Sequence, residues 1–592
     1  MLKIFKYLKR NEIIQIIFAA ILIVGQVWLN LRLPDYMADI TKYIESPNAT
    51  MENVLTAGAW MLACALGASI LAVLTGFIAA RVATSFSKTL RAEVFDKTLS
   101  FSMAEINKFS TASLITRSTN DVTQIQSIFA MGLQVMVQAP ILAVMAIFKI
   151  SGRGVEWSIA TGIAVFVVIC LNIFLVTVAV PKFRIIQKLT DNLNRVIREH
   201  LTGVRVVHAY NAENYQGAKF EQANDEVMNT NLFVNRAMAI LMPTITLLMQ
   251  GLTLAIYLIG AQMIHNAALP SVDPSARITI FSNMVVFSSY AKQIIMAFMM
   301  MAMIFILIPR AMVSAKRVLE VLETPLSIVD GELKTSLVGH EGEIEFKNVS
   351  FKYPDAQDAV LENISFKANK GETVAFIGST GSGKSTLIHL IPRFYDVTSG
   401  EVLVNGRDVR EYKQEALLNK IGYVSQKAVL FSGTVASNVA YGSNGVEQLT
   451  QEGVKRAVAI AQGQDFVEKM EDQYEASIAQ GGTNVSGGQK QRLSIARAVG
   501  RTPDIFIFDD SFSALDYKTD RVLRSVLKKE TAGVTSLIVA QRIGTIKDAD
   551  KIIVLDEGKM VGIGKHKELL QTCETYKEIA YSQLSKEELE NE

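Results

Sequence analysis

Six long apolar stretches in the first half of the chain constrain its fold more than any other feature of the sequence. A helix needs about 20 mainly apolar residues to cross the hydrocarbon core of a bilayer, and each stretch is long enough. The sequence therefore predicts a bundle of six membrane-spanning helices. The stretches are residues 13–33, 54–80, 128–150, 155–180, 237–264 and 278–308.

Charge gives this bundle an orientation. Lys3, Lys6, Lys9 and Arg10 precede the first stretch, whereas the loop after it, PDYMADITKYIESPNATMEN, is acidic. Basic flanks stay on the cytoplasmic side of a membrane, and an even number of spans returns the chain to the side where it began. We expect residues 1–12 to form an interfacial helix, and both termini to be cytoplasmic in a protein of the cell membrane.

The connections between the spans differ in length. Residues from about 81 to 127 and from about 181 to 236 are polar and nearly free of proline, which is typical of helical hairpins. An arm of about 23 residues, rising 1.5 Å per residue, projects roughly 35 Å. Such hairpins, with tips near residues 103–110 and 210–216, can carry force between the membrane and a soluble domain. Solvated loops are the alternative.

The sixth stretch contains SSYAKQIIMAFMMMAMIF, and a lysine at that depth is costly unless it faces water or a partner group. Methionine clusters offer a soft and adaptable surface. We interpret these side chains, with glutamines of other spans, as the lining of a cavity for amphiphilic small molecules. Helix packing, with the lysine extended to the surface, is the alternative. The candidate cavity residues are Gln138, Lys292, Gln293, Met296 and Met300.

From about residue 340 the sequence is typical of a soluble α/β protein, and it contains ETVAFIGSTGSGKSTLIHLI. A strand-like run leads into the pattern G-x-x-x-x-G-K-[ST], and a helix follows. The backbone N–H groups of such a loop surround phosphate oxygens, Lys384 neutralises the β and γ phosphates, and Ser385 is placed to ligate Mg²⁺. The candidate nucleotide-binding residues are Tyr353, expected to stack on adenine, and Gly378, Ser379, Thr380, Gly381, Ser382, Gly383, Lys384, Ser385 and Thr386.

Three further segments extend this phosphate site. The apolar run IFIFDD ends a strand with Asp509, where a carboxylate for Mg²⁺ belongs. Gln426, in VSQKAVLF, is expected to reach Mg²⁺ or the attacking water. The third segment lies at the start of a basic helix, where its small residues form a second phosphate cradle. Two chains that face each other can bring both cradles to one γ-phosphate more easily than a single chain can. It comprises Ser486, Gly487, Gly488 and Gln489.

In this order the motifs resemble those of ABC transporters, and six spans with two long hairpins are similar to the exporter half-transporters of that family. The resemblance implies a membrane α-helical bundle of the ABC exporter type fused to an α/β P-loop NTPase domain. It also implies a head-to-tail dimer that holds ATP and Mg²⁺ between the phosphate loop of one chain and the SGGQ segment of the other. Hairpin tips would dock as coupling helices, and the membrane part would alternate its access.

This resemblance sets the expected domain boundaries. They are an interfacial helix at 1–12, a transmembrane domain at 13–323, a linker at 324–342, a nucleotide-binding domain at 343–585 and a tail at 586–592.

Two positions depart from the family pattern. A glutamate normally follows the strand aspartate as general base, and a histidine stands in a later stretch like LIVAHR; here they are Asp510 and Gln541. The shorter side chain withdraws the carboxylate by roughly 1 Å, and a misplacement of that size can cost on the order of 100-fold in rate. Gln541 can donate a hydrogen bond but has no cationic form. We predict a degenerate catalytic site that binds ATP and hydrolyses it slowly; tolerated variants in an active homodimer are the alternative.

The intact SGGQ segment would serve the site of the opposite chain. The prediction is therefore a translocating ATPase, one subunit of a heterodimeric multidrug-type exporter of amphiphilic or hydrophobic compounds. Its partner would be a second half-transporter that carries the glutamate and the histidine. A homodimeric exporter of lipid or peptide, or an ATP-gated regulatory membrane protein, are the alternatives. The net charge of +2 gives no argument for a nucleic-acid partner.

Overall fold

The computed structural model describes residues 2–45, 50–266, 274–442 and 449–584. The chain divides into two compact units, which we describe separately. The first comprises Met1–Leu99 and Ser110–Thr324, and the second comprises Ser100–Phe109 and Pro325–Glu592. The expected tail at 586–592 lies outside the described residues.

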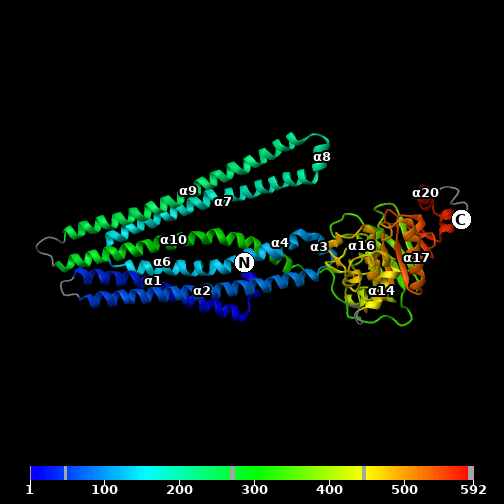
Figure 1. The fold of residues 1–592 in the computed structure, drawn as a ribbon, viewed down its shortest axis with the longest axis horizontal. Helices are drawn as coiled ribbons and strands as arrows, with labels where there is room; N and C mark the ends of the chain where they lie inside the picture. The colour runs from blue at the N-terminus through cyan, green and yellow to red at the C-terminus, as the bar shows by residue number, and fades with distance from the viewer. Residues whose placement is uncertain (1, 46–49, 267–273, 443–448, 585–592) are drawn as a thin grey trace. The chain divides into compact units, whose positions relative to one another are not determined.

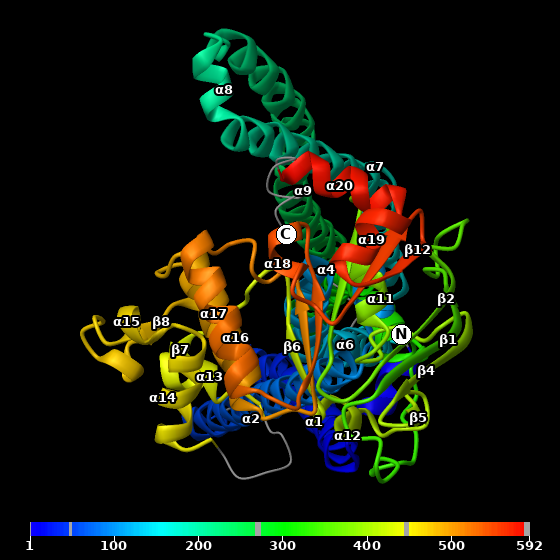
Figure 2. The same cartoon turned by 90° about the vertical axis from the view of Figure 1, so that its right-hand side faces the viewer.

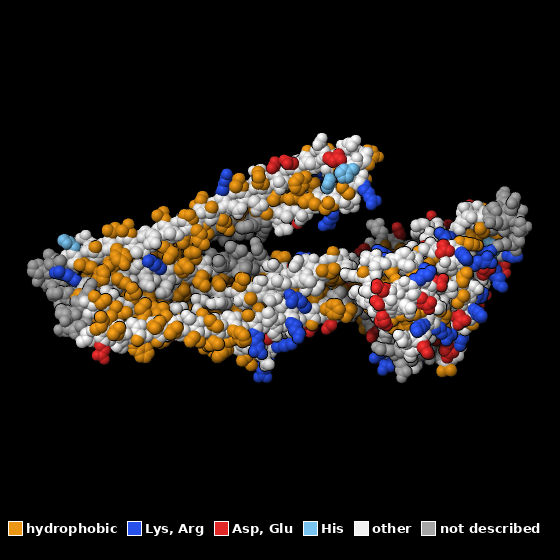
Figure 3. All heavy atoms as spheres, in the orientation of Figure 1, with side chains coloured by type: hydrophobic (Ala, Val, Ile, Leu, Met, Phe, Trp, Pro, Cys, Tyr) orange, Lys and Arg blue, Asp and Glu red, His pale blue; other side chains and the backbone are white. Residues whose placement is uncertain are grey.

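The first unit is built from long helices that run side by side (Figure 1). Within the described residues, six helical stretches are long and apolar enough to cross a membrane, which confirms the expected number of spans. Apolar side chains cover the visible face of these helices (Figure 3). The helices are α1 (Arg10–Glu45), α2 (Met51–Leu99), α4 (Thr111–Thr116), α5 (Val122–Ser127), α6 (Leu133–Ile150), α7 (Val155–Thr202), α8 (Val204–Ala209), α9 (Glu213–Asn266) and α10 (Pro274–Leu322).

Two helical hairpins extend from the spans. In the first, α2 continues its span without a break, and the chain returns through α4, α5 and α6, which are joined by π-helical turns at Arg117–Asp121 and Ile128–Gly132. In the second, α7 and α9 form the arms and α8 the tip (Figure 1). This second tip begins a few residues before the expected segment 210–216, because Gly203 ends α7.

The N-terminal segment differs from the expected single helix over residues 1–12. Leu2–Tyr7 form a short 3-10 helix, and α1 already begins at Arg10. The side chain of Glu12 accepts a hydrogen bond from the backbone N–H of Lys9 at 2.8 Å. This bond satisfies a donor at the start of α1, where helices leave their first N–H groups without a partner.

The second unit contains two main β-sheets. A four-stranded antiparallel sheet has the order β2-β1-β4-β5, and a six-stranded sheet has the order β12-β11-β3-β10-β9-β6, in which only β12 is antiparallel. The strands are β1 (Ile344–Phe351), β2 (Leu361–Ala368), β3 (Thr373–Gly378), β4 (Ser399–Val404), β5 (Arg407–Asp408), β6 (Ile421–Val424), β9 (Ile505–Asp509), β10 (Thr535–Val539), β11 (Lys551–Asp556) and β12 (Lys559–Gly564), with a small pair β7 (Gly433–Thr434) and β8 (Ser477–Ile478).

Helices flank the six-stranded sheet (Figure 2). Alternate residues of a buried strand face opposite sides, so Phe506 and Phe508 of β9 join one apolar core and Ile505 and Ile507 join the other. The helices of the second unit are α3 (Met103–Phe109), α11 (Lys384–His389), α12 (Gln414–Leu418), α13 (Val435–Val439), α14 (Gln451–Ile460), α15 (Gln464–Val467), α16 (Gly487–Gly500), α17 (Tyr517–Glu530), α18 (Ile543–Ile546), α19 (His566–Thr572) and α20 (Glu574–Gln583).

Candidate functional site: a phosphate loop and two facing carboxylates

The phosphate loop connects β3 to α11 at the carboxyl edge of the parallel sheet, where open α/β folds place their ligands. A Cβ atom at Gly378 would lie 2.0 Å from the carbonyl oxygen of Leu555, and one at Gly383 would lie 2.7 Å from Leu361 Cδ2. Gly383 also has φ +94°, a conformation that side chains disfavour. These two positions require glycine, so the motif spacing reflects the shape of the loop.

Lys384 lies inside this loop. Its Nζ donates to the carbonyl oxygens of Gly378 (3.0 Å) and Ser379 (2.7 Å) and to Ser382 Oγ (3.3 Å). Burial lowers the pKa of Lys384, and the nearby carboxylates of Asp510 and Asp509 act in the opposite direction. Oxygen acceptors therefore hold the ammonium group inside the loop whose N–H groups are expected to surround a phosphate. Ser379, Thr380 and Gly381 are exposed at the apex of the loop.

Oxygen ligands meet where α11 faces the end of β9. Ser385 Oγ donates to Asp509 Oδ1 at 2.8 Å, and Asp509 is buried. A hydroxyl and a carboxylate suit Mg²⁺, which binds through one or two protein oxygens together with the phosphates of its substrate. In the described part of the chain no group of three or more His, Cys, Asp or Glu side chains forms a separate metal site. The residues present thus fit a magnesium ion that arrives with nucleotide.

Sequence reasoning missed two side chains that flank Asp509. His389 Nε2 lies 3.6 Å from Asp509 Oδ2 and 3.1 Å from the hydroxyl of Tyr423. Burial, and then the charge of Asp509, raise the pKa of Tyr423, so this phenol keeps its proton. His389 follows Ser385 by four residues on α11, and residues at this spacing share one helix face. This four-residue spacing from the predicted Mg²⁺ ligand Ser385 is the sequence signal that could have identified His389 as a site residue.

Asp510 is held by two amide side chains. Gln541 Nε2 donates to Asp510 Oδ2 at 2.9 Å, and Gln426 Nε2 donates to the same oxygen at 3.3 Å. The backbone of Asp510 is left-handed (φ +46°), and its N–H donates to the carbonyl oxygen of Val539 on β10. Burial raises the pKa of Asp510, and the charge of Asp509 adds to that effect. Three positions predicted from separate motifs therefore form one network.

Tyr353 lies near the start of α11, and its aromatic ring packs against two other rings. Its hydroxyl is 3.0 Å from Thr386 Oγ1 on α11. Its ring packs edge to face against Phe351 (centroids 4.9 Å apart) and Tyr395 (5.2 Å). The structure thus places the Tyr353 hydroxyl against α11, and stacking of Tyr353 on adenine stays a prediction.

The SGGQ segment is not part of this cluster. Ser486 caps α16, with Ser486 Oγ accepting from the N–H of Gln489 and the Gln489 side chain accepting from the N–H of Ser486. Ser486 and Gly487 are exposed. Among the described residues, no hydrogen bond joins this segment to the phosphate loop. Ser486 and Gln489 satisfy each other in this cap, which leaves the N–H groups of Gly487 and Gly488 without an intrahelical partner.

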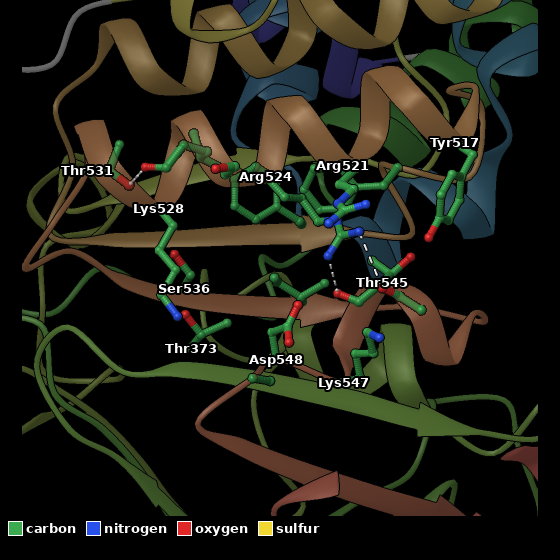
Figure 4. Close-up of a pocket in the computed structure, with 17 residues that line it drawn as sticks. Thr373, Tyr517, Arg521, Arg524, Lys528, Thr531, Ser536, Thr545, Lys547 and Asp548 are labelled. Carbon is green, nitrogen blue, oxygen red and sulfur yellow. Dashed lines mark hydrogen bonds between the residues drawn. The ribbon is translucent and has the colours of Figure 1, made fainter. Parts of the chain in front are cut away.

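Arg524 ties α17 to α18, the short helix that follows Gln541. Its Nη1 donates to the carbonyl oxygen of Thr545 (3.0 Å) and its Nη2 to that of Gly544 (3.3 Å) (Figure 4). Asp520 pairs with its Nε and Nη2. Arg524, Gly544 and Thr545 border a cavity of about 730 Å³, whose lining includes none of the phosphate-loop residues. The contacts fix the position of the strand-end segment that carries Gln541.

The candidate cavity residues of the first unit are only partly brought together. Lys292 and Gln293 line a cavity of about 550 Å³, as expected for a charged group that faces a wet space. Met296 and Met300 are excluded from it because they lie one and two helical turns further along α10. Gln138 does not line the cavity either. It lies one turn of α6 before Leu142, which does line it.

Comparison with known proteins places these features in a family. Residues 361–513 match the ABC transporter family and residues 13–298 match the ABC transporter transmembrane region. An uncharacterized ABC transporter ATP-binding protein of Mycobacterium tuberculosis (strain ATCC 25618 / H37Rv) is 41% identical over 488 residues, which are 82% of this chain and 81% of that protein. An ATP-dependent lipid A-core flippase of Syntrophus aciditrophicus (strain SB) is 30% identical over 83% of this chain and 79% of that protein.

A solved structure shares the fold. The structure of a bacterial Atm1-family ABC exporter with ATP bound has a TM-score of 0.73 to this chain, covers 97% of this chain and 99% of that one, and is 23% identical in sequence.

Proposed function

The chain belongs to the ABC transporter family, with the membrane and ATP-binding domains fused in one polypeptide, and on that premise we propose that it is one subunit of a heterodimeric exporter. In this proposal its own phosphate loop binds ATP but hydrolyses it slowly. Its termini and second unit lie on the cytoplasmic side of the cell membrane. The exporter fold and the six spans support transport, and the chemistry around Asp510 supports the asymmetry.

The observation that carries the proposal is the pair of amides on one carboxylate oxygen. A general base must contact the water that it activates, at about 2.6–3.2 Å. Asp510 Oδ2 is already occupied by Gln541 and Gln426, and the aspartate side chain reaches one methylene less far than glutamate. Gln541 is a neutral amide, which cannot accept a proton from water or stabilise the γ-phosphate with a positive charge.

Nucleotide binding does not depend on those two positions. Lys384, Ser385 and Asp509 keep the arrangement that phosphates and Mg²⁺ need. When bound, Mg²⁺ neutralises charge on the phosphoryl group that is transferred. Ser385 Oγ and the Asp509 carboxylate would hold the ion, and the side-chain oxygen of Gln426 is proposed as a further ligand. The site is thus equipped to retain ATP.

The exposed SGGQ segment supports a second chain. In its first turn the N–H groups of exposed Gly487 and its neighbour Gly488 have no intrahelical partner, which suits a nucleotide held by an opposing phosphate loop. The partner in this proposal is a half-transporter that retains the glutamate and the histidine, so the competent site combines its phosphate loop with Ser486, Gly487, Gly488 and Gln489 of this chain. Tyr210 and Tyr215, exposed near the tip of the second hairpin, are the side chains proposed to dock on that partner.

An amphiphilic cargo is part of the same proposal. The relative from Syntrophus aciditrophicus is a lipid flippase, which supports a substrate with apolar and polar parts. The cavity at Lys292 has both kinds of lining.

The test isolates this chain's own ATP site. In the assembled pair, the catalytic glutamate of the partner is replaced by glutamine, so the remaining ATPase activity reports the site of Lys384. We expect a slow rate that the double variant Asp510→Glu/Gln541→His raises on the order of 100-fold, because the carboxylate regains its reach and a protonatable group returns. Lys384→Met in the same background abolishes the gain. Brisk hydrolysis by the unmodified chain purified alone would overturn the proposal.

A further inference from the structure

A cavity of about 550 Å³ lies among α1, α2, α6, α9 and α10 of the first unit. Its walls divide by chemistry. Leu33, Met61 and Leu142 supply apolar surface, whereas Asn30 and Gln293 supply amide groups beside the ammonium of Lys292. Its size suits a small molecule, since ligand pockets are typically about 300–1,000 Å³.

Lys292 has no counter-ion among the residues that the structure describes. It is half-buried and lies within the apolar stretch Arg277–Met301 of α10. No carboxylate is among the residues that line the cavity, all of which the structure describes. Across the described residues Lys292 makes no ion pair or side-chain hydrogen bond. A charge within a membrane span is costly unless another group compensates it. An anion that enters the cavity could therefore form an ion pair with Lys292 without competing with another carboxylate.

The one carboxylate adjacent in sequence to the cavity lining is already engaged. Pro34 lines the cavity, and the next residue, Asp35, accepts from Lys149 Nζ at 2.5 Å and from Arg153 Nη2 at 3.1 Å. The hydroxyl of Tyr290 donates to the same side chain at 2.8 Å. Two cations therefore share one anion there, and Asp35 is not free to neutralise a further lysine.

We propose that this cavity binds amphiphiles with an anionic headgroup, a phosphate or a carboxylate. The headgroup contacts Lys292 and the amides of Asn30 and Gln293, and the apolar chain lies along Leu33 and Met61. The binding site itself does not depend on the proposed export function. Only the statement that the bound ligand is exported rests on that function, and it then narrows the cargo to acidic amphiphiles. Cationic amphiphiles of the same chain length are disfavoured by the charge of Lys292.

The experiment compares two fluorescent lysolipids that share one acyl chain, lysophosphatidic acid and lysophosphatidylcholine. Their equilibrium binding to the full-length chain is measured in neutral detergent without nucleotide. We expect the anionic probe to bind at least about tenfold more tightly than the zwitterionic probe. Lys292→Met should reduce that preference to less than about twofold, whereas Lys292→Arg, which keeps the charge, should retain it.

Two controls define the site and the ligand. Lys88→Met removes an exposed lysine of α2 that does not line the cavity, and it should leave the preference unchanged. Millimolar inorganic phosphate should not displace the anionic probe, because it lacks the chain. Equal affinity for both probes, an unchanged preference in Lys292→Met, or displacement by inorganic phosphate would overturn the inference.

This binding assay is independent of ATP hydrolysis. A chain that prefers the anionic probe but hydrolyses ATP briskly alone overturns the asymmetric exporter and leaves the binding site standing. A chain with slow hydrolysis and no headgroup preference overturns the binding site alone.

Discussion

Asp510 combines burial, a left-handed backbone and a second carboxylate next to it, and this arrangement has a pH signature. Burial raises its pKa, so the folded chain binds that proton more tightly than the unfolded chain does. When folding raises the pKa of a carboxyl group, its ionised form destabilises the folded chain at every pH above the folded-state pKa. This destabilisation shrinks as the pH falls through the folded-state pKa, and it is gone below the unfolded-state pKa. We expect Asp510→Asn to raise the thermal unfolding midpoint of the nucleotide-free chain at neutral pH. The gain should vanish in acid; a gain that persists there would contradict this explanation.

The residues of the ATP site were predictable to different degrees. Gln426, Asp510 and Gln541 each belong to a motif with a fixed place in the sequence, but their shared hydrogen bonds depend on how β6, β9 and β10 end side by side. His389 and Tyr423 were missed because an isolated histidine or tyrosine in an apolar run is more often a core residue. Only the fold brings both to Asp509.

At the scale of elements, α3 is attached to the second unit through a carboxylate. Glu105 is buried and accepts from the backbone N–H groups of Ser102 (2.7 Å) and Ser327 (3.0 Å). Burial raises its pKa, but these hydrogen bonds outweigh that effect and the pKa is lowered. Its contribution to stability is therefore present above the ordinary glutamate pKa and is lost as the pH falls through the lowered one. Glu105→Ala should destabilise the second unit by about 1–3 kcal/mol, because a buried backbone donor loses its partner.

The measurement for Glu105→Ala is the urea unfolding midpoint of the second unit's signal in the full-length chain. Asn107→Ala is the matched control on the same short helix, since it removes one partly exposed hydrogen bond to Tyr395 and should cost less than about 1 kcal/mol. Equal losses for the two variants would show that Glu105 has no special role. If α3 transmits force, Glu105→Ala should also abolish the stimulation of ATPase activity by transported substrate in the pair.

Elements were predicted well where hydropathy or motif spacing defines them, and less well where neither does. The six spans follow from apolar length alone. Their continuation into long helices such as α2, which has 49 residues, was predicted from a different signal, the polar and nearly proline-free composition of residues 81–127. The π-helical turns at Arg117–Asp121 and Ile128–Gly132 leave no pattern in the sequence. Composition also did not distinguish methionines that line the cavity from those that pack elsewhere.

At the scale of the whole molecule, the two ATP half-sites of one chain are expected to contribute unequally to the pair. In the proposed pair, the phosphate loop of Lys384 would serve the slow site, and the exposed SGGQ segment would serve the partner's competent site. Gly487 offers a clean probe, because a Cβ atom there meets no atom within 4 Å and the residue is exposed. Gly487→Asp should therefore fold normally while it places a negative charge against the γ-phosphate held by the partner.

We expect Gly487→Asp to lower the ATPase rate of the pair on the order of 100-fold, the scale seen when one stabilising donor to a transition state is lost. Lys384→Met in the same pair removes nucleotide from a site that turns over slowly, and should lower the rate at least about tenfold less. Both substitutions are in this chain, but they act on different nucleotides. Lys384→Met affects the ATP bound by this chain, and Gly487→Asp affects the ATP bound by the partner. Equal losses would mean that both sites hydrolyse ATP alike. In that case the amides on Asp510 would be a tolerated variation within a symmetric pump.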